Sequence, residues 1–92
     1  MTAKNEEAVS LLEFPCRFPI KAMGRASDEF ESHVTAIVLN HAQLWPEEVV
    51  TSAPSKQGNF VSITVTIEAE SQQQLDAIYQ ELTDSSLVMM AL

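Results

Sequence analysis

The sequence predicts an α+β domain, and three observations support this fold class. Two stretches, 17–24 and 60–69, alternate apolar and polar side chains with the period of a β-strand. Two others carry apolar side chains at helical spacing, and each begins with capping signals. Shorter apolar stretches at 47–53 and 87–92 complete the order βαββαβ, that of the ferredoxin-like sandwich. We therefore expect a four-stranded antiparallel sheet with strands one and three in its middle and both helices on one face.

The first strand, at 17–24, contains a proline and ends at a glycine. Pro19 cannot donate a hydrogen bond to a ladder, so we expect it at a strand start or at a bulge. Gly24 is predicted to break the run. The preceding residues 1–10 are polar and show no clear period, which predicts a flexible N-terminal tail ahead of a single domain at 11–92.

The first helix begins at Ser27 or Asp28, because either can cap it, and Asp28 with Glu31 has capping-box spacing. Pro46 limits the helix, which is expected to end near Ala42. Its predicted buried face consists of Phe30, Val34, Ile37, Val38 and His41.

The second half of the chain repeats this pattern. A turn is predicted at 54–59, where Gly58 can take a positive φ. The strand at 60–69 has the strongest alternation in the chain. Ser71 with Gln74 then forms a capping box for the second helix. The buried face of that helix is predicted to consist of Leu75, Ile78, Tyr79 and Leu82.

Composition limits the classes of function. The 92 residues fit one domain, and no apolar run approaches the about 20 residues that span a bilayer. A single cysteine excludes an internal disulfide framework and favours a reducing compartment, so we expect a cytoplasmic protein. Thirteen acidic against five basic residues give a net charge of -8, which disfavours nucleic acid and anionic membranes as partners.

Three segments carry a resemblance to a known family: LLEFPCRFPIKAMG near the start, PSKQGNFVSITVTIEA in the middle and VMMAL at the end. On these, residues 11–92 resemble the YbeD-like family of small bacterial proteins of unknown function. The resemblance implies a ferredoxin-like fold similar in shape to the ACT domains that bind small effectors. It carries over no catalytic residue. The chain departs from the family where Lys56 is followed by Gln57 instead of the turn glycine.

Nucleophile and metal-ligand patterns are weak. Cys16 neighbours Arg17, but adjacent strand residues point to opposite faces, so an incidental thiol is favoured over a reactive one. His33 and His41 are eight residues apart on one helix, about 12 Å along its axis, too far to share a metal. We expect His33 to be solvated and His41 to be a hydrogen-bonded residue at the helix end. No metal, cofactor or catalytic residue is predicted.

The strongest candidate site is a row of basic side chains on strand one. If the even-numbered residues face the helices, the odd-numbered ones face the uncovered side of the sheet, beside the hydroxyl row of strand three. The residues of this candidate face are Arg17, Lys21, Arg25, Ser62, Thr64 and Thr66. They could receive a small anionic ligand or an acidic partner.

A solvated face is the alternative, in which the bases offset nearby acids such as Glu68. The three bases span about 27 Å, so they cannot all contact one small ligand. A bulge at Pro19 would also displace Arg17 from the row.

The last segment, 87–92, is apolar on both faces of a regular strand, so one set of side chains lies outside the core. The 8–14 segment or another chain is expected to cover that set, or it is simply exposed at the chain end. We therefore expect a non-catalytic regulatory or binding module that senses a small anionic effector or docks a partner through the uncovered face. The alternative is an adaptor or self-associating domain that uses its edge strands and has no ligand.

Overall fold

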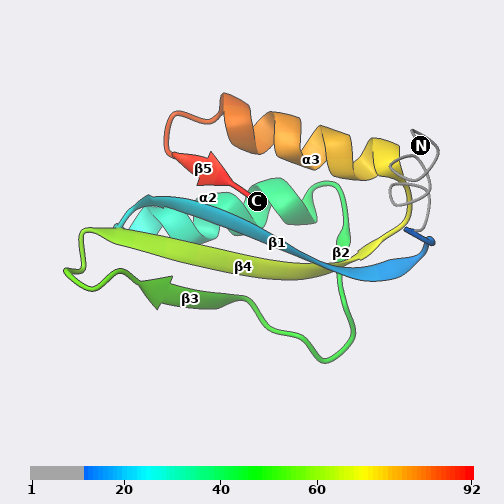
Figure 1. Ribbon diagram of the computed structural model, residues 1–92, viewed down its shortest axis with the longest axis horizontal. Helices are drawn as coiled ribbons and strands as arrows, with labels where there is room; N and C mark the ends of the chain where they lie inside the picture. The colour runs from blue at the N-terminus through cyan, green and yellow to red at the C-terminus, as the bar shows by residue number, and fades with distance from the viewer. Residues whose placement is uncertain (1–11) are drawn as a thin grey trace, which may run out of the picture.

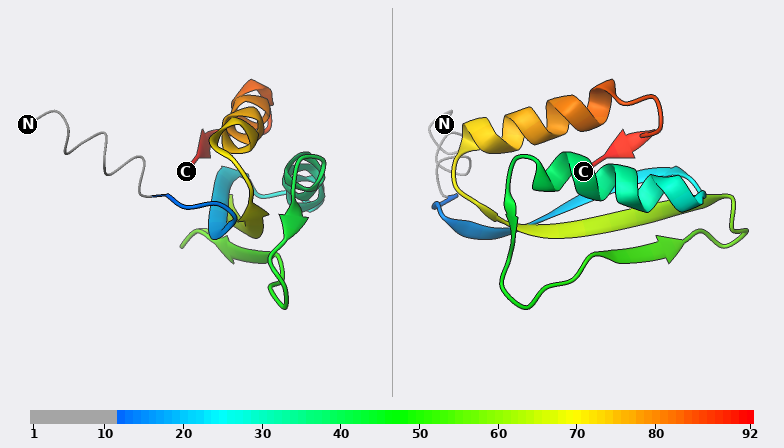
Figure 2. Two further views of the ribbon diagram at one scale, coloured as in Figure 1. Left: turned by 90° about the vertical axis from the view of Figure 1, so that its right-hand side faces the viewer. Right: turned by 180° about the vertical axis from the view of Figure 1, so that it is seen from behind.

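The structure, a computed structural model, describes residues 12–92; the tail predicted for residues 1–10 lies outside them. Two helices lie on one side of an antiparallel sheet (Figures 1 and 2), as the predicted fold class requires. No helix in this part of the chain is long and apolar enough to cross a membrane. The elements in chain order are β1 (Cys16–Arg25), α2 (Asp28–Leu39), β2 (Gln43–Leu44), β3 (Thr51–Pro54), β4 (Phe60–Ala69), α3 (Gln72–Asp84) and β5 (Met90–Ala91).

The long strands β1 and β4 form the middle of the sheet. They pair antiparallel over their full ten residues, from Cys16 opposite Ala69 to Arg25 opposite Phe60. β5 pairs with the other edge of β1, while β2 and β3 both pair with β4. Since β1 occupies one edge of β4 throughout, β2 and β3 share the other edge. The sheet thus has the four predicted positions, one of which is filled by two short strands.

The prediction of a strand at 47–53 is wrong in detail, because the chain makes an excursion between β2 and β3. The Trp45 N–H donates to the carbonyl of Thr66 at 3.0 Å, and the Glu48 N–H donates back to the Trp45 carbonyl at 3.0 Å. Glu47 has a φ of 68°, a left-handed conformation that interrupts any strand. The chain returns to β4 only at Thr51.

The helix ends differ from the predicted ones. α2 ends at Leu39, so His41 lies beyond the helix and outside its buried face. Ser27 is its N-cap, but the Ser27 side chain makes no capping hydrogen bond. Asp28 is the first helical residue, so the predicted capping box from Asp28 to Glu31 is wrong.

The capping box of α3 is confirmed in a slightly shifted form. The Ser71 hydroxyl accepts from the Gln74 N–H at 3.0 Å. The Gln74 side chain accepts from the N–H of Glu70, one residue before the cap, at 2.7 Å. One orphan amide at the start of the helix, that of Gln74, is therefore satisfied, and the second bond ties the residue before the cap to the first turn.

The core lies between the sheet and the helices. Even-numbered β1 residues and odd-numbered β4 residues face it, as the alternation predicts, and Tyr79 packs at its margin. β1 runs to Arg25, so Gly24 lies inside the strand instead of ending it. The fully or nearly fully buried apolar side chains are Ile20, Ala22, Phe30, Val34, Ile37, Val38, Ile63, Val65, Ile67, Ala69, Leu75, Ile78 and Leu82.

The predicted last strand at 87–92 is reduced to Met90–Ala91. Two residues of this segment lie opposite Met23. Met90 is paired with Met23, and the Met89 N–H donates to the carbonyl of Met23 at 2.8 Å. Two residues opposite one is the arrangement of a β-bulge, which breaks the alternation of faces. Both methionines are therefore exposed, whereas Val88 and Ala91 pack against the core.

Candidate functional site

The open face of the sheet, which the helices leave uncovered, carries the odd-numbered side chains of β1. The pairing of β1 with β4 has no bulge at Pro19, which lies opposite Thr66. Parity is therefore kept along the whole strand, and Arg17, Lys21 and Arg25 are all exposed on this face. They lie opposite Glu68, Thr64 and Phe60 of β4.

Arg17 differs from the other two bases because it has an acidic partner. Its Nη2 lies 3.0 Å from Oε2 of Glu48, and its Nε donates to the same oxygen at 3.3 Å. The pair joins the start of β1 to the excursion between β2 and β3. For Lys21 and Arg25, no ion pair forms within residues 12–92. Within the described part of the chain, the basic row thus consists of two cations without an acidic partner and one, Arg17, that has a partner.

The predicted hydroxyl row also divides. Thr66 is only 4% exposed, so its hydroxyl is not available to a ligand. Its backbone carbonyl accepts a hydrogen bond from the Trp45 N–H. Ser62 and Thr64 are half-buried and remain on the open face. Thr64 lies between Lys21 on β1 and Thr51 on β3. One cation and two hydroxyls therefore follow each other across three strands.

An apolar hollow of about 280 Å³ lies at one end of the open face. Met23 and Phe60 supply its largest side chains, and Met23 stands between Lys21 and Arg25 along β1. Met23 is odd-numbered, so the sequence predicts that it lies on the same face as the bases. The β3 residues of the hollow could not be predicted, because their position depends on the register of β3 against β4. The hollow is lined by Met23, Ala53, Pro54, Ser55, Phe60, Val61 and Ser62.

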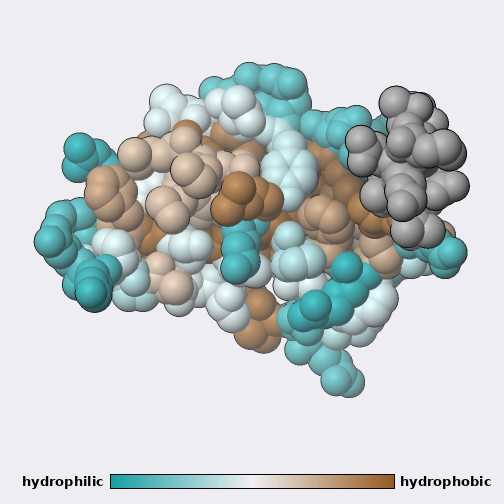
Figure 3. All heavy atoms as spheres, viewed as in Figure 1, coloured by the Kyte–Doolittle hydropathy of each residue, from teal (hydrophilic) through white to brown (hydrophobic). Residues whose placement is uncertain are grey.

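The apolar surface continues onto the β5 segment. Met90 is paired with Met23, and Leu92 exchanges two backbone hydrogen bonds with Lys21, at 3.0 and 2.8 Å. Met90 is 52% and Leu92 68% exposed. Figure 3 shows apolar atoms gathered around β5 and the adjoining part of β1. Of the 8–14 segment expected to cover such a surface, the described residues reach only as far back as Leu12, and Phe14 packs against the core instead.

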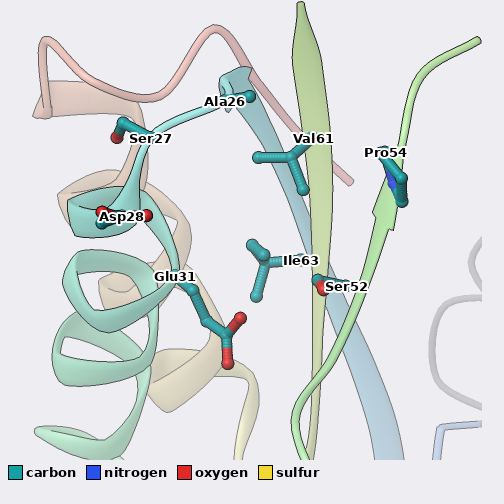
Figure 4. A pocket seen from close by; sticks show the side chains of 8 residues that line it. All are labelled: Ala26, Ser27, Asp28, Glu31, Ser52, Pro54, Val61 and Ile63. Carbon is teal, nitrogen blue, oxygen red and sulfur yellow. The ribbon is translucent and has the colours of Figure 1, made fainter. Parts of the chain in front are cut away.

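A second hollow, of about 370 Å³, lies on the helix side of the sheet between α2 and β3 (Figure 4). Val61 and Ile63 of β4 form its floor, and Ser52 lies on the β3 side. Asp28 and Glu31 of α2 line the opposite side. Two carboxylates at the rim repel an anion, so the predicted anionic ligand does not suit this hollow.

Cys16 and the bases lie on different sides of the sheet. Cys16 is half-buried and packs against the core, whereas Arg17 points to the open face. The guanidinium therefore does not face the thiol, which agrees with an incidental thiol instead of a reactive one.

The two histidines connect the helices. His41 Nε2 lies 2.7 Å from Oε1 of Glu81, which agrees with the expected hydrogen-bonded residue at a helix end. His33 was predicted to be solvated, which is wrong: it is half-buried, and its Nε2 lies 2.7 Å from the hydroxyl of Ser85. Each histidine thus holds the α2 region to α3. Among residues 12–92, no three His, Cys, Asp or Glu side chains gather as a metal site would require.

The fold and the open face define a class of small α+β module, with one sheet face covered by helices and the other presenting basic and apolar side chains together. A family model described as "Protein of unknown function (DUF493)" matches residues 9–92. The chain belongs to this family, which confirms the resemblance seen in the sequence.

Relatives match over nearly their whole length. A UPF0250 protein of Neisseria gonorrhoeae is 43% identical over 89 residues, which cover 97% of this chain and 98% of the relative. A UPF0250 protein of Chromobacterium violaceum is 46% identical over 88 residues, with 96% and 99% covered.

A solved structure has the same fold. The solution structure of protein HP0495 from H. pylori superposes with a TM-score of 0.66 and covers 88% of this chain and 85% of its own. Its sequence identity is 17%, so this likeness concerns the fold alone.

Proposed function

We propose that the protein is a non-catalytic binding module that docks a protein partner through the open face of its sheet. The observation that carries the proposal is the position of Met23, an exposed apolar side chain between Lys21 and Arg25, two cations that form no ion pair with any residue of 12–92. Interfaces combine an apolar centre with a polar rim. Three of the five basic residues of an acidic chain lie on this one strand.

Backbone geometry favours the face over the edges as the docking surface. Lys21 exchanges hydrogen bonds with Leu92, so the backbone groups of odd-numbered β1 residues point away from β4. Pro19 is also odd-numbered and lies on the part of this β1 edge that Leu92 does not reach. It has no N–H to donate to a strand added there. Pro54 does the same at the β3 edge, since the Ser55 N–H next to it points toward Phe60 of β4. Proline at an edge discourages strand addition, which argues against the edge-strand adaptor.

A small anionic effector is a second candidate function, favoured by one observation. Lys21, Thr64 and Thr51 lie side by side on three strands, so a carboxylate or phosphate could contact an ammonium and two hydroxyls. The depression next to Lys21 holds only about 30 Å³, which leaves such a ligand largely in solvent. The test is a thermal-shift screen with mono- and dicarboxylates and phosphate esters. A shift that Lys21→Glu abolishes supports this candidate, and no shift by any compound contradicts it.

Photo-cross-linking tests the docking proposal directly. A benzoylphenylalanine at position 23 would lie on the open face, and the same residue at position 80 would lie on the exposed side of α3. Irradiation of bacterial cells that express the full chain should give a discrete heavier adduct from position 23 and none from position 80. Adducts of equal yield from both positions, or none from position 23, contradict docking through this face.

A further inference from the structure

We infer that the open face recognises a partner segment in which one apolar side chain is flanked by carboxylates. The inference rests on the proposed docking function and specifies the chemistry of the partner. The apolar side chain enters the hollow between Met23 and Phe60, and the carboxylates reach Lys21 and Arg25 on either side.

The size of the hollow selects a side chain over a whole small molecule. Its volume of about 280 Å³ is just below the range of about 300–1,000 Å³ in which drug-sized ligands are enclosed. It is also open toward solvent on the sheet surface, so it cannot surround a free ligand. A single aromatic or aliphatic anchor in a central pocket is how a few residues supply most of the binding energy of an interface. Met23 can adapt its unbranched thioether side chain to the shape of that anchor.

The charges around the hollow specify what flanks the anchor. Lys21 and Arg25 are each two residues from Met23 on the same face, which puts each about 7 Å from it along the strand. Neither forms an ion pair within residues 12–92, whereas Arg17 does so with Glu48. Burying these cations under a neutral or basic partner would cost free energy, and carboxylates at matching spacing offset that cost.

A second copy of the chain is a poorer occupant of this face. In a two-fold contact the same patch meets itself, so the Lys21 and Arg25 side chains of one copy would oppose those of the other. Like charges facing each other across an interface cost several kcal/mol. A segment of a different protein therefore fits this face better than the same face of a second copy.

A peptide array tests the inference with the full chain as the binding protein. Each peptide has one central position occupied by Phe, Leu, Ser or Asn, flanked within four residues on both sides by Glu, Lys or Ser. We expect Glu-flanked peptides with a central Phe or Leu to bind at least about tenfold more tightly than Lys-flanked ones or those with a central Ser. In the double variant Lys21→Glu/Arg25→Glu the preference should switch to Lys flanks.

A matched pair of variants separates the hollow from other apolar surface. Met23 and Leu39 are each 39% exposed, but Leu39 lies on α2, away from the open face. Met23→Ser should weaken binding of the best peptide about tenfold, and Leu39→Ser should leave it unchanged. Melting temperatures of both variants verify that they are folded.

The inference is overturned if no Glu-flanked peptide binds, if flank charge makes no difference, or if the double variant keeps the wild-type preference. A concentration-dependent dimer by light scattering that Met23→Ser dissolves would also overturn it, in favour of a second copy. Failure of the peptides together with a cross-linked partner at position 23 removes the inference and leaves the docking proposal standing. Absence of any adduct at position 23 removes both.

Discussion

At the scale of single residues, Gly24 shows why a glycine in a strand can serve packing instead of ending the strand. It is buried in β1, opposite Val61. A Cβ at this position would overlap the carbonyl oxygen of Leu87 and the ring of Phe30, whose Cζ would be 2.7 Å away. The missing side chain therefore lets the helix and the segment before β5 approach the strand.

Substitution of this glycine should destabilise the fold. Gly24→Ala is expected to lower the free energy of unfolding by about 1–3 kcal/mol, because the Leu87 carbonyl is backbone and cannot move aside as a side chain would. Urea denaturation measures the effect. Gly58→Asn is the control: Gly58 has a φ of 77° and open space around it, and asparagine tolerates positive φ. Equal stability of Gly24→Ala and wild type would refute the packing role.

At the scale of elements, the two helices differ in how their first turns are satisfied. Ser71 accepts the Gln74 N–H, whereas Ser27 occupies the same cap position of α2 without a capping bond. Ser71→Ala should therefore cost about 1 kcal/mol of stability, and Ser27→Ala should cost much less. Chemical denaturation of the two single variants provides the comparison. An equal or larger loss for Ser27→Ala would contradict this difference between the two caps.

The elements also show what local sequence can predict. Alternation in 17–24 and 60–69 is a property of neighbouring residues, so it located both central strands and the faces of Lys21 and Ser62. The split edge strand could not be found this way. It depends on Glu47 taking a positive φ, which no local preference indicates, and on Trp45 bonding to the backbone of Thr66. The bulge at Met89 could not be predicted from alternation either, because it is defined by the hydrogen bond of Met89 to Met23 of β1.

The candidate site was predictable to the same extent. Parity alone put the three bases on one face, yet the engagement of Arg17 depends on Glu48, which is 31 residues away. The burial of Thr66 likewise depends on tertiary structure, since an alternating pattern assigns a side to a residue but no degree of cover. The hollow beside Met23 needs β3 at the correct register against β4.

For the whole molecule, Tyr79 couples stability to alkaline pH. Its half-buried ring packs at the core margin, and desolvation raises the pKa of its hydroxyl above the ordinary value of 10.0. The folded state thus favours the neutral phenol. Its contribution to stability is complete below pH 10 and is lost as the pH rises through 10 toward the raised pKa, because the unfolded chain ionises first.

The phenylalanine variant isolates this contribution. Urea midpoints of the wild type should fall between pH 9 and 11 more steeply than those of Tyr79→Phe, which has no proton to lose. Parallel curves for the two proteins would mean that other groups, such as the lysines, account for the alkaline loss.

The alternation of β1 has a consequence for how such a protein can diversify. Its even-numbered residues build the core and its odd-numbered residues face outward. The packing and the exposed surface are therefore determined by different residues of one ten-residue strand. Substitutions at positions 21, 23 and 25 can change the charge and polarity of the open face at little cost in stability, since exposed positions tolerate exchange. An insertion or deletion of a single residue would instead move the apolar side chains to the exposed face and the polar ones into the core, which would disrupt both the packing and the surface. Evolution, or an engineer, could therefore alter the chemistry of the open face by point substitution alone, with the length of the strand held fixed.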